Sequence, residues 1–211
     1  GQLTGSAFLE GVRAELASAI SVTDGMRRFS DLRFTAGGTT VTGDLTQGTT
    51  GLYTGKLSVR APNIETAAAL FLVEASGAID ADLTLAAEGG RQNADIRASV
   101  TSLKAEGIAI GKGQIEARVE DLFTVPMVQG SLDATAVSAA GVDVSQLRAT
   151  AEQAGDTTRF STTATLANGA SASAGGALTP ERDGYRLVLE SAEVARGSLS
   201  ARLVEPASLL V

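Results

Sequence analysis

Apolar and polar residues alternate along almost the whole of this 211-residue chain. In the clearest stretch, 77–85, the apolar positions are every second residue: Ile79, Ala81, Leu83 and Leu85. The residues between them are Asp80, Asp82 and Thr84. Successive side chains of a strand point to opposite faces of a sheet, so this period of two predicts strands with one apolar and one polar face.

Turn signals separate the alternating stretches. Gly89-Gly90 lies between 77–85 and a second stretch with apolar residues at Ile96, Ala98 and Val100, which together predict a hairpin. Similar turn pairs support further strands at Met26–Ala36, Thr39–Gln47, 147–153, 157–167, 170–178 and 185–190. No Pro- and Ser-rich linker divides the chain. We therefore expect an all-β, elongated and mainly antiparallel sheet over residues 1–211, with no internal domain boundary.

A glycine-led phrase occurs five times. Each copy has an apolar residue two places after the glycine, a small or β-branched residue four places after it, and usually another apolar residue six places after it. The copies begin at Gly55, Gly77, Gly113, Gly130 and Gly197. Their spacing varies, so they do not form a fixed-period repeat. We interpret the phrase as a strand-opening device, in which glycine permits the turn and the pleat then sets the two faces.

Two segments depart from the strand pattern. Asn63 is a good helix-capping residue and good helix formers follow it, which predicts one short helix near 63–72. Segment 8–20 fits both a helical stripe and a strand. The helical stripe is Leu9, Val12, Leu16 and Ile20, and the strand uses every second residue from Val12 to Ile20. The strand-rich context favours a strand.

Composition excludes several classes of function. The chain has no His, Cys or Trp, which removes the commonest general bases, thiol nucleophiles and zinc ligands. Its formal charge of −7, without clusters of Lys and Arg, argues against a nucleic-acid partner. We expect a protein that is not an enzyme and that needs no cofactor or metal.

Local motifs that suggest chemistry have simpler explanations. Asp80 and Asp82 share a strand face, but it is the polar one, so a solvated sheet surface accounts for them. The glycine-rich stretch 107–113 lacks the Ser or Thr after Lys112, and the following helix, of a phosphate-binding loop. No motif in the chain therefore predicts a catalytic residue.

The remaining functional candidate is the apolar face itself. With aromatic residues at only 4%, this face consists mainly of Ala, Val, Leu and Ile, and it either packs shut or leaves a groove. The residues that we expect on it are Leu32, Phe34, Leu57, Val59, Ile79, Ala81, Leu83, Leu85, Ile96, Ala98, Val100, Ile115, Ala117, Val119, Leu132, Ala134, Phe160, Leu187, Leu189, Leu199 and Leu203.

Two parts of the sequence carry a resemblance to a known family. One is the closing part, which includes 158–169, 170–178, Gly184-Tyr-Arg-Leu-Val-Leu-Glu190, 197–203 and 206–211. The other runs from Ala61-Pro-Asn-Ile64 through 67–71 to Gly77-Ala-Ile-Asp-Ala-Asp-Leu83. Both are similar to stretches of the TamB family of translocation and assembly module proteins, within the AsmA-like group. The likeness covers the chain from about Met26 onward, and 8–20 fits it least.

The resemblance implies a fold and a function. It implies a segment of a long, repetitive β-rich periplasmic protein, tethered to the inner membrane by a part that lies outside this sequence. Its sheet curls into a β-taco, or trough, with an apolar interior that conducts the acyl chains of phospholipid toward the outer membrane. The implied protein partner is the outer-membrane barrel TamA, reached through other parts of the chain, and the implied role includes outer-membrane protein assembly.

Two other functions compete with this one. The first is a secreted β-helical or β-sandwich structural domain of the adhesin type, whose inner face would be dry and fully packed. The second is a carbohydrate-active β-helix enzyme, which would need a cluster of carboxylates in a cleft.

Overall fold

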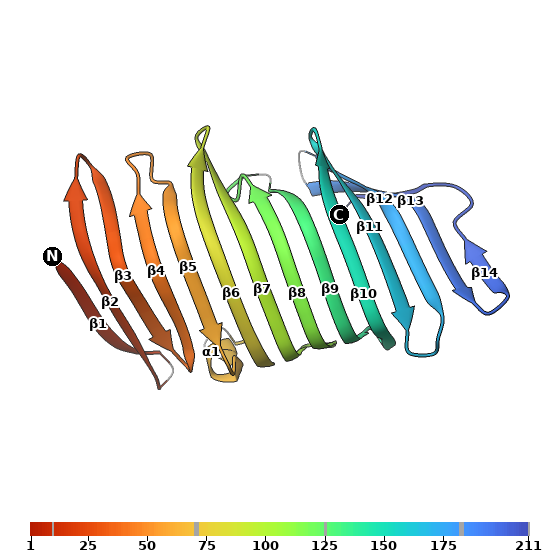
Figure 1. The fold of residues 1–211 in the computed structure, drawn as a ribbon, viewed down its shortest axis with the longest axis horizontal. Helices are drawn as coiled ribbons and strands as arrows, with labels where there is room; N and C mark the ends of the chain where they lie inside the picture. The colour runs from red at the N-terminus through yellow and green to blue at the C-terminus, as the bar shows by residue number, and fades with distance from the viewer. Residues whose placement is uncertain (10, 70–71, 125, 182–183, 211) are drawn as a thin grey trace.

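The chain folds into one antiparallel sheet of 15 strands. The computed structural model describes residues 1–9, 11–69, 72–124, 126–181 and 184–210. Strands β1 to β14 follow one another across the sheet in chain order (Figure 1). Strand β15 pairs with β13. The strands are β1 Gln2–Leu9, β2 Val12–Thr23, β3 Met26–Ala36, β4 Thr39–Gln47, β5 Tyr53–Ala61, β6 Ala75–Glu88, β7 Arg91–Ala105, β8 Ile108–Glu120, β9 Met127–Ala139, β10 Val142–Ala154, β11 Thr157–Leu166, β12 Ser171–Glu181, β13 Gly184–Arg196, β14 Leu199–Arg202 and β15 Ala207–Leu210. The predicted all-β, elongated sheet is confirmed.

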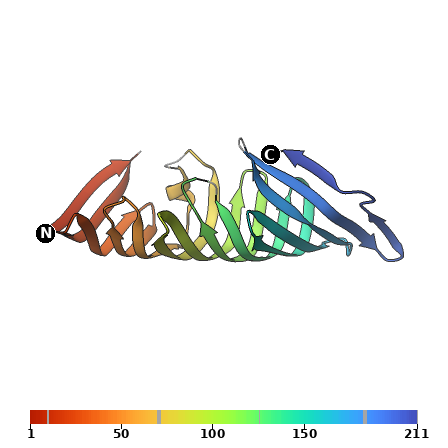
Figure 2. The ribbon, with the colours of Figure 1, turned by 90° about the horizontal axis from the view of Figure 1, so that it is seen from above.

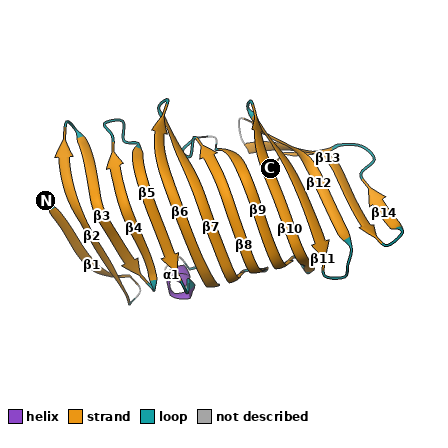
Figure 3. Ribbon diagram, in the orientation of Figure 1, coloured by secondary structure: helices purple, strands orange, loops and turns teal. Residues whose placement is uncertain are grey.

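Both segments that departed from the strand pattern have a defined structure. Segment 8–20 forms the end of β1 and most of β2, so the predicted strand is confirmed among the described residues. The expected helix is α1, Glu65–Ala69, shown in purple in Figure 3. The side chain of Asn63 caps it by accepting a hydrogen bond from the backbone N–H of Glu65 at 3.0 Å. Residues 70 and 71 of the expected helical segment lie outside the described residues.

The strand-opening interpretation of the glycines is wrong. Gly55, Gly77, Gly113 and Gly130 lie inside β5, β6, β8 and β9, and only Gly197 lies in a turn. At Gly130 the backbone has a φ of 153°, and a Cβ atom there would collide with the carbonyl oxygen of Glu116 on β8. The glycine is therefore needed where two strands approach each other closely, because any side chain would separate them.

Three such glycines fall in a single row that crosses the sheet. Following the strand register from β3 to β13 gives Leu32, Gly43, Leu57, Leu83, Ile96, Ala117, Gly130, Ala151, Phe160, Gly176 and Leu189. We call this set the floor row. A Cβ atom at Gly43 would meet the carbonyl oxygen of Lys56, and one at Gly176 would meet that of Val188. Both glycines thus permit the same close strand approach as Gly130.

The sheet curls toward the face that carries the floor row, which we call the inner face. Figure 2 shows this curl from above. Tyr185 of β13 lies on the inner face, and its hydroxyl donates a hydrogen bond to the carbonyl oxygen of Pro126, just before β9, at 3.3 Å. β9 also contacts β11, although β10 separates them in the sheet. Such contacts between strands that are not neighbours require the inner face to be concave.

No second layer covers this concave face within the described residues. Seven apolar side chains are buried, and six of them are alanines. The accessible surface is 13326 Å². A compact globular protein of this mass is expected to expose about 9,100 Å². The excess is the surface of a sheet that remains open on both faces.

We predict that Gly130→Ala lowers the free energy of unfolding by about 1–3 kcal/mol, because the added methyl group strains the backbone or forces β8 and β9 apart. Chemical denaturation of the purified chain measures this change. Gly5→Ala in β1 is the matched control, since a Cβ atom at Gly5 has no neighbour within 4 Å. Equal stability of the two variants would contradict a packing role for Gly130.

Candidate functional site

The strand register gathers nearly all of the predicted apolar residues on the inner face. The floor row contains seven of them, as given above. A second row runs through Phe34, Val41, Val59, Ala81, Ala98, Ile115 and Leu132. A third contains Ile79, Val100, Gly113 and Ala134, and a fourth contains Leu45, Gly55, Leu85, Ala94 and Val119. Leu187 faces Leu178 of β12 and Leu209 of β15 in a further short row.

The last two predicted residues lie at the margin of this face. Leu199 is opposite Arg196 at the start of β14 and is 77% exposed. Leu203 follows the end of β14, and its backbone N–H donates to the carbonyl oxygen of Ala192 at 2.7 Å. Both therefore belong to the edge of the sheet and not to its curved centre.

Three irregularities in the strands conceal further inner-face residues from a simple period of two. Asp31, Ser102 and Ala136 have positive φ angles of 53°, 51° and 51° and lie where the pairing of their strands shifts or is interrupted. On one side of each irregularity the inward-pointing side chains belong to even-numbered residues, and on the other side to odd-numbered residues. The residues that this change brings onto the inner face, and that the alternation did not predict, include Phe29, Leu103, Ile110 and Val137.

Other inner-face residues follow the ordinary alternation and were still missed. Val41 and Leu45 of β4 alternate around Gly43, and Leu16 of β2 faces Phe34. The signal that identifies them is the same period of two. It is weaker in β4 because Thr39 and Gly43 occupy inward positions, and in β2 because Ala14 and Ser18 lie two positions on either side of Leu16.

Charged side chains are almost absent from the inner face. Among the residues that the strand register places there, only Arg27 and Arg196 are charged, and both lie at strand ends. The carboxylates and the other basic residues of the described strands occupy the outer face or the turns. The inner face is therefore an apolar surface that crosses the whole sheet.

The outer face carries the ion pairs. Asp80 and Asp82, which sequence analysis assigned to a solvated surface, lie there with Arg60, whose nitrogens approach them at 3.6 and 3.2 Å. Arg118 on β8 lies within 4 Å of three carboxylates. All these groups are partly or largely exposed, so each pair contributes little to stability.

This outer network lowers the pKa of one carboxyl group, that of Asp82. A hydrogen bond from the Ser58 hydroxyl, followed by those from Arg60, holds the pKa of Asp82 below its usual value of 3.8. Because the folded-state pKa is lowered, the interaction stabilises the fold above the unfolded-state pKa. That stabilisation is lost as the pH falls through the folded-state pKa.

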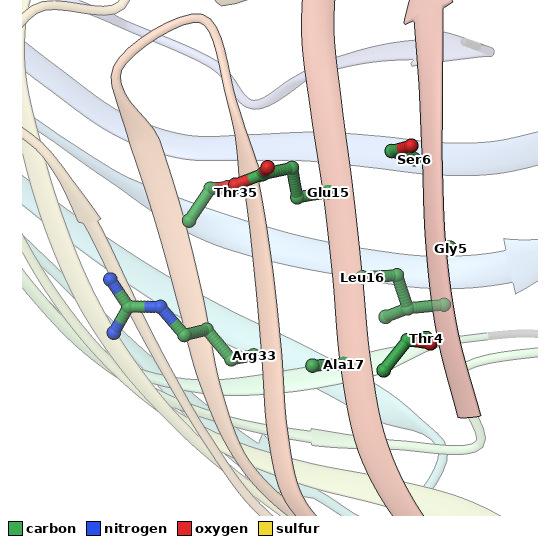
Figure 4. Close-up of a pocket in the computed structure, with 8 residues that line it drawn as sticks. All are labelled: Thr4, Gly5, Ser6, Glu15, Leu16, Ala17, Arg33 and Thr35. Atoms are coloured by element: carbon green, nitrogen blue, oxygen red, sulfur yellow. The ribbon is translucent and has the colours of Figure 1, made fainter. Parts of the chain in front are cut away.

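The hollows of the surface lie at separate places on the sheet. One, of about 420 Å³, is lined by residues of β1, β2 and β3 (Figure 4). Most of its lining is polar and belongs to the outer face, including Glu15, Arg33 and Thr35. A larger hollow of about 1130 Å³ lies between α1 and the adjoining ends of β6 and β7. Within the described part of the chain, no three Asp or Glu residues are grouped closely enough to hold a metal ion, and no helix is long and apolar enough to cross a membrane.

No protein-family model, curated protein or solved structure matches this chain.

We predict that Ser58→Ala raises the pKa of Asp82 toward its usual value, because the variant removes the largest cause of the shift. Carboxyl-detected NMR titration of both proteins between pH 2 and about 6 measures this change. Ser99→Ala on β7, on the same face, is the control and is expected to leave the titration of Asp82 in place. An unchanged Asp82 titration in Ser58→Ala would show that the hydroxyl is not the cause.

Proposed function

We propose that this chain is a wall segment of a bridge-like periplasmic protein that conducts phospholipid between the inner and outer membranes and supports outer-membrane biogenesis. The observation that carries the proposal is the inner face, an uncovered and almost uncharged apolar surface that continues from strand to strand across the sheet. A surface of this kind on one side of a curved sheet suits long apolar chains that slide along it.

The chemistry of this surface favours passage over retention. Burial of each acyl methylene contributes about 0.8 kcal/mol, which is enough to draw an acyl chain out of water. The aliphatic wall offers few polar groups that would hold one lipid in one position. The 13 gaps between the 14 consecutive strands, at about 4.8 Å each, give the segment a length of roughly 60 Å. That is about twice the thickness of a bilayer core.

The competing structural function requires a different interior. A β-sandwich or β-helix of the adhesin type places its apolar face against a second sheet or a further coil of the chain. Among the described residues the apolar face has no such cover, and Ile115 in its centre is 40% exposed. This exposure favours a groove over a sealed core.

The cellular setting of the proposal rests on the resemblance to the TamB family. From it come the periplasmic location, the inner-membrane tether outside this sequence and the partnership with the outer-membrane barrel TamA. The resemblance also assigns no catalytic residue and no cofactor to the chain. These parts of the proposal depend on the resemblance to the family. Acyl-chain binding, in contrast, is tested on the chain itself.

We predict that a photo-reactive amino acid at Leu83, in the floor row, crosslinks to phospholipid acyl chains. The same group at Thr84, the next residue on the outer face, should not, because the two side chains point to opposite sides of β6. The test mixes each variant with vesicles of phosphatidylethanolamine and phosphatidylglycerol that carry radiolabelled acyl chains, and it measures label attached to the protein after irradiation.

In a longer protein that carries this segment, Leu83→Asp, Val100→Asp or Val119→Asp should block lipid supply to the outer membrane, because a carboxylate interrupts the apolar path. Thr84→Asp is the matched control. Protein level and far-ultraviolet circular dichroism separate a blocked path from a loss of folding. Normal lipid supply with well-folded inner-face variants, or equal lipid labelling from Leu83 and Thr84, would count against conduction along this face.

A further inference from the structure

A band of polar side chains borders the apolar face at one rim. The rim is the one at the top of Figure 1, where the β2–β3, β4–β5 and β6–β7 turns lie. In the strand register, Arg27 faces Gln47, and Gln47 faces Tyr53. Arg27 donates a hydrogen bond to the side-chain oxygen of Gln47 at 3.3 Å, and Gln47 donates to the hydroxyl of Tyr53 at 3.0 Å. We call Arg27, Gln47, Tyr53 and Gln92 the polar band.

Gln92 anchors this band. Among the described residues it is the most deeply buried large side chain, at 2% exposure. Its side-chain oxygen accepts from the backbone N–H of Tyr53 at 2.7 Å, and its side-chain nitrogen donates to the carbonyl oxygen of Tyr53 at 2.9 Å. These bonds connect β7 to β5 across the intervening β6 and fix the backbone that carries the Tyr53 phenol.

Arg27 has no carboxylate partner among the described residues. Its single side-chain hydrogen bond goes to the neutral amide of Gln47, and no Asp or Glu that the structure describes lies within 4 Å of its guanidinium. Most other arginines on the central strands, such as Arg60, Arg118 and Arg148, are paired with carboxylates on the outer face. The remaining donors of Arg27 are therefore available to an anion at the rim of the groove.

The positive charge lies next to the apolar wall. Phe29 on β3 and Leu45 on β4 are the next inward-facing residues in the direction away from the rim, each two residues from Arg27 or Gln47 on its own strand. Two residues of a strand cover about 7 Å. An amphiphile with its headgroup on the polar band would therefore place the start of its tail on Phe29 and Leu45 and the rest toward the floor row.

We propose that the polar band binds the anionic headgroup of a lipid whose acyl chain lies on the inner face, with Arg27 as the charged ligand for phosphate. This inference rests on the proposed function and adds a headgroup site to it. The guanidinium supplies paired donors to phosphate oxygens, and the Gln47 amide and Tyr53 hydroxyl provide further polar groups beside them. Lipids then enter the groove in one orientation, with the tail inward and the phosphate at this rim.

Decyl phosphate and 1-decanol test the proposal, because they share one tail and differ in the headgroup. Isothermal titration calorimetry of the 211-residue chain is expected to show decyl phosphate binding about five- to tenfold more tightly than decanol. Arg27→Gln should abolish this preference and leave decanol binding unchanged. Arg28→Gln is the matched control, since it removes the same charge from the adjacent, outward-facing position. Arg27→Lys should restore part of the preference.

The outcomes separate this proposal from the proposed function. If both probes bind equally well to the unmodified chain, the groove holds acyl chains but the headgroup site is overturned. If Arg27→Gln and Arg28→Gln reduce the preference equally, the effect is one of general charge and the site is likewise overturned. Inorganic phosphate that binds as tightly as decyl phosphate would identify a site for the free anion instead of a lipid. Binding of neither amphiphile would contradict acyl-chain binding itself.

Discussion

The backbone hydrogen bonds between strands that follow one another in the chain are the interaction on which the rest of this structure depends. A globular domain is held together by an interior that excludes water from both sides of its layers. Here only seven apolar side chains are buried among the described residues, so packing of that kind is limited. Cohesion comes instead from backbone pairing along long strands and from cross-strand contacts such as Leu57 with Leu83 and Ile115 with Leu132. Because each strand from β2 to β12 pairs with the strands before and after it in the chain, the sheet can lengthen without any second layer.

Close strand approach at the glycines accompanies the curvature of this sheet. A flat sheet of large aliphatic side chains would expose its whole apolar face to water. In the floor row the missing side chains of Gly43, Gly130 and Gly176 let the neighbouring backbone move inward. The ring of Phe160 lies over Gly176, within about 3 Å of where a Cβ atom would stand, and fills the space that the glycine leaves. Close strand approach and apolar lining are therefore combined in the same row of residues.

The sequence predicts the strands and most of the inner face because a period of two is a local property. Thr39–Gln47 and Met26–Ala36 form strands with the bounds that their alternation and turn pairs indicate. Alternation cannot predict the places where it is interrupted. Asp31, Ser102 and Ala136 share no residue type that would mark an irregularity, and their positive φ angles coincide with breaks in the pairing between strands. The role of Gly130 is likewise non-local, because the carbonyl group that excludes its side chain belongs to Glu116 on another strand. The polar band escaped prediction for the same reason, since its members are up to 65 positions apart, from Arg27 to Gln92.

Side-chain size in the second row changes along the sheet. In the second row the residues from β3 to β9 include Phe34, Val59 and Ile115, whereas those from β10 to β13 are Ala149, Thr162, Ala174 and Ala192. The smaller residues occupy the part where Tyr185 reaches across to Pro126 and where β9 contacts β11. Large aliphatic side chains there would meet one another across the narrow concavity and force it open. In this row the wall is thus bulkier from β3 to β9 and smaller from β10 to β13, whereas the floor row keeps the large side chains of Phe160 and Leu189 in the second part, so the apolar lining continues across the sheet.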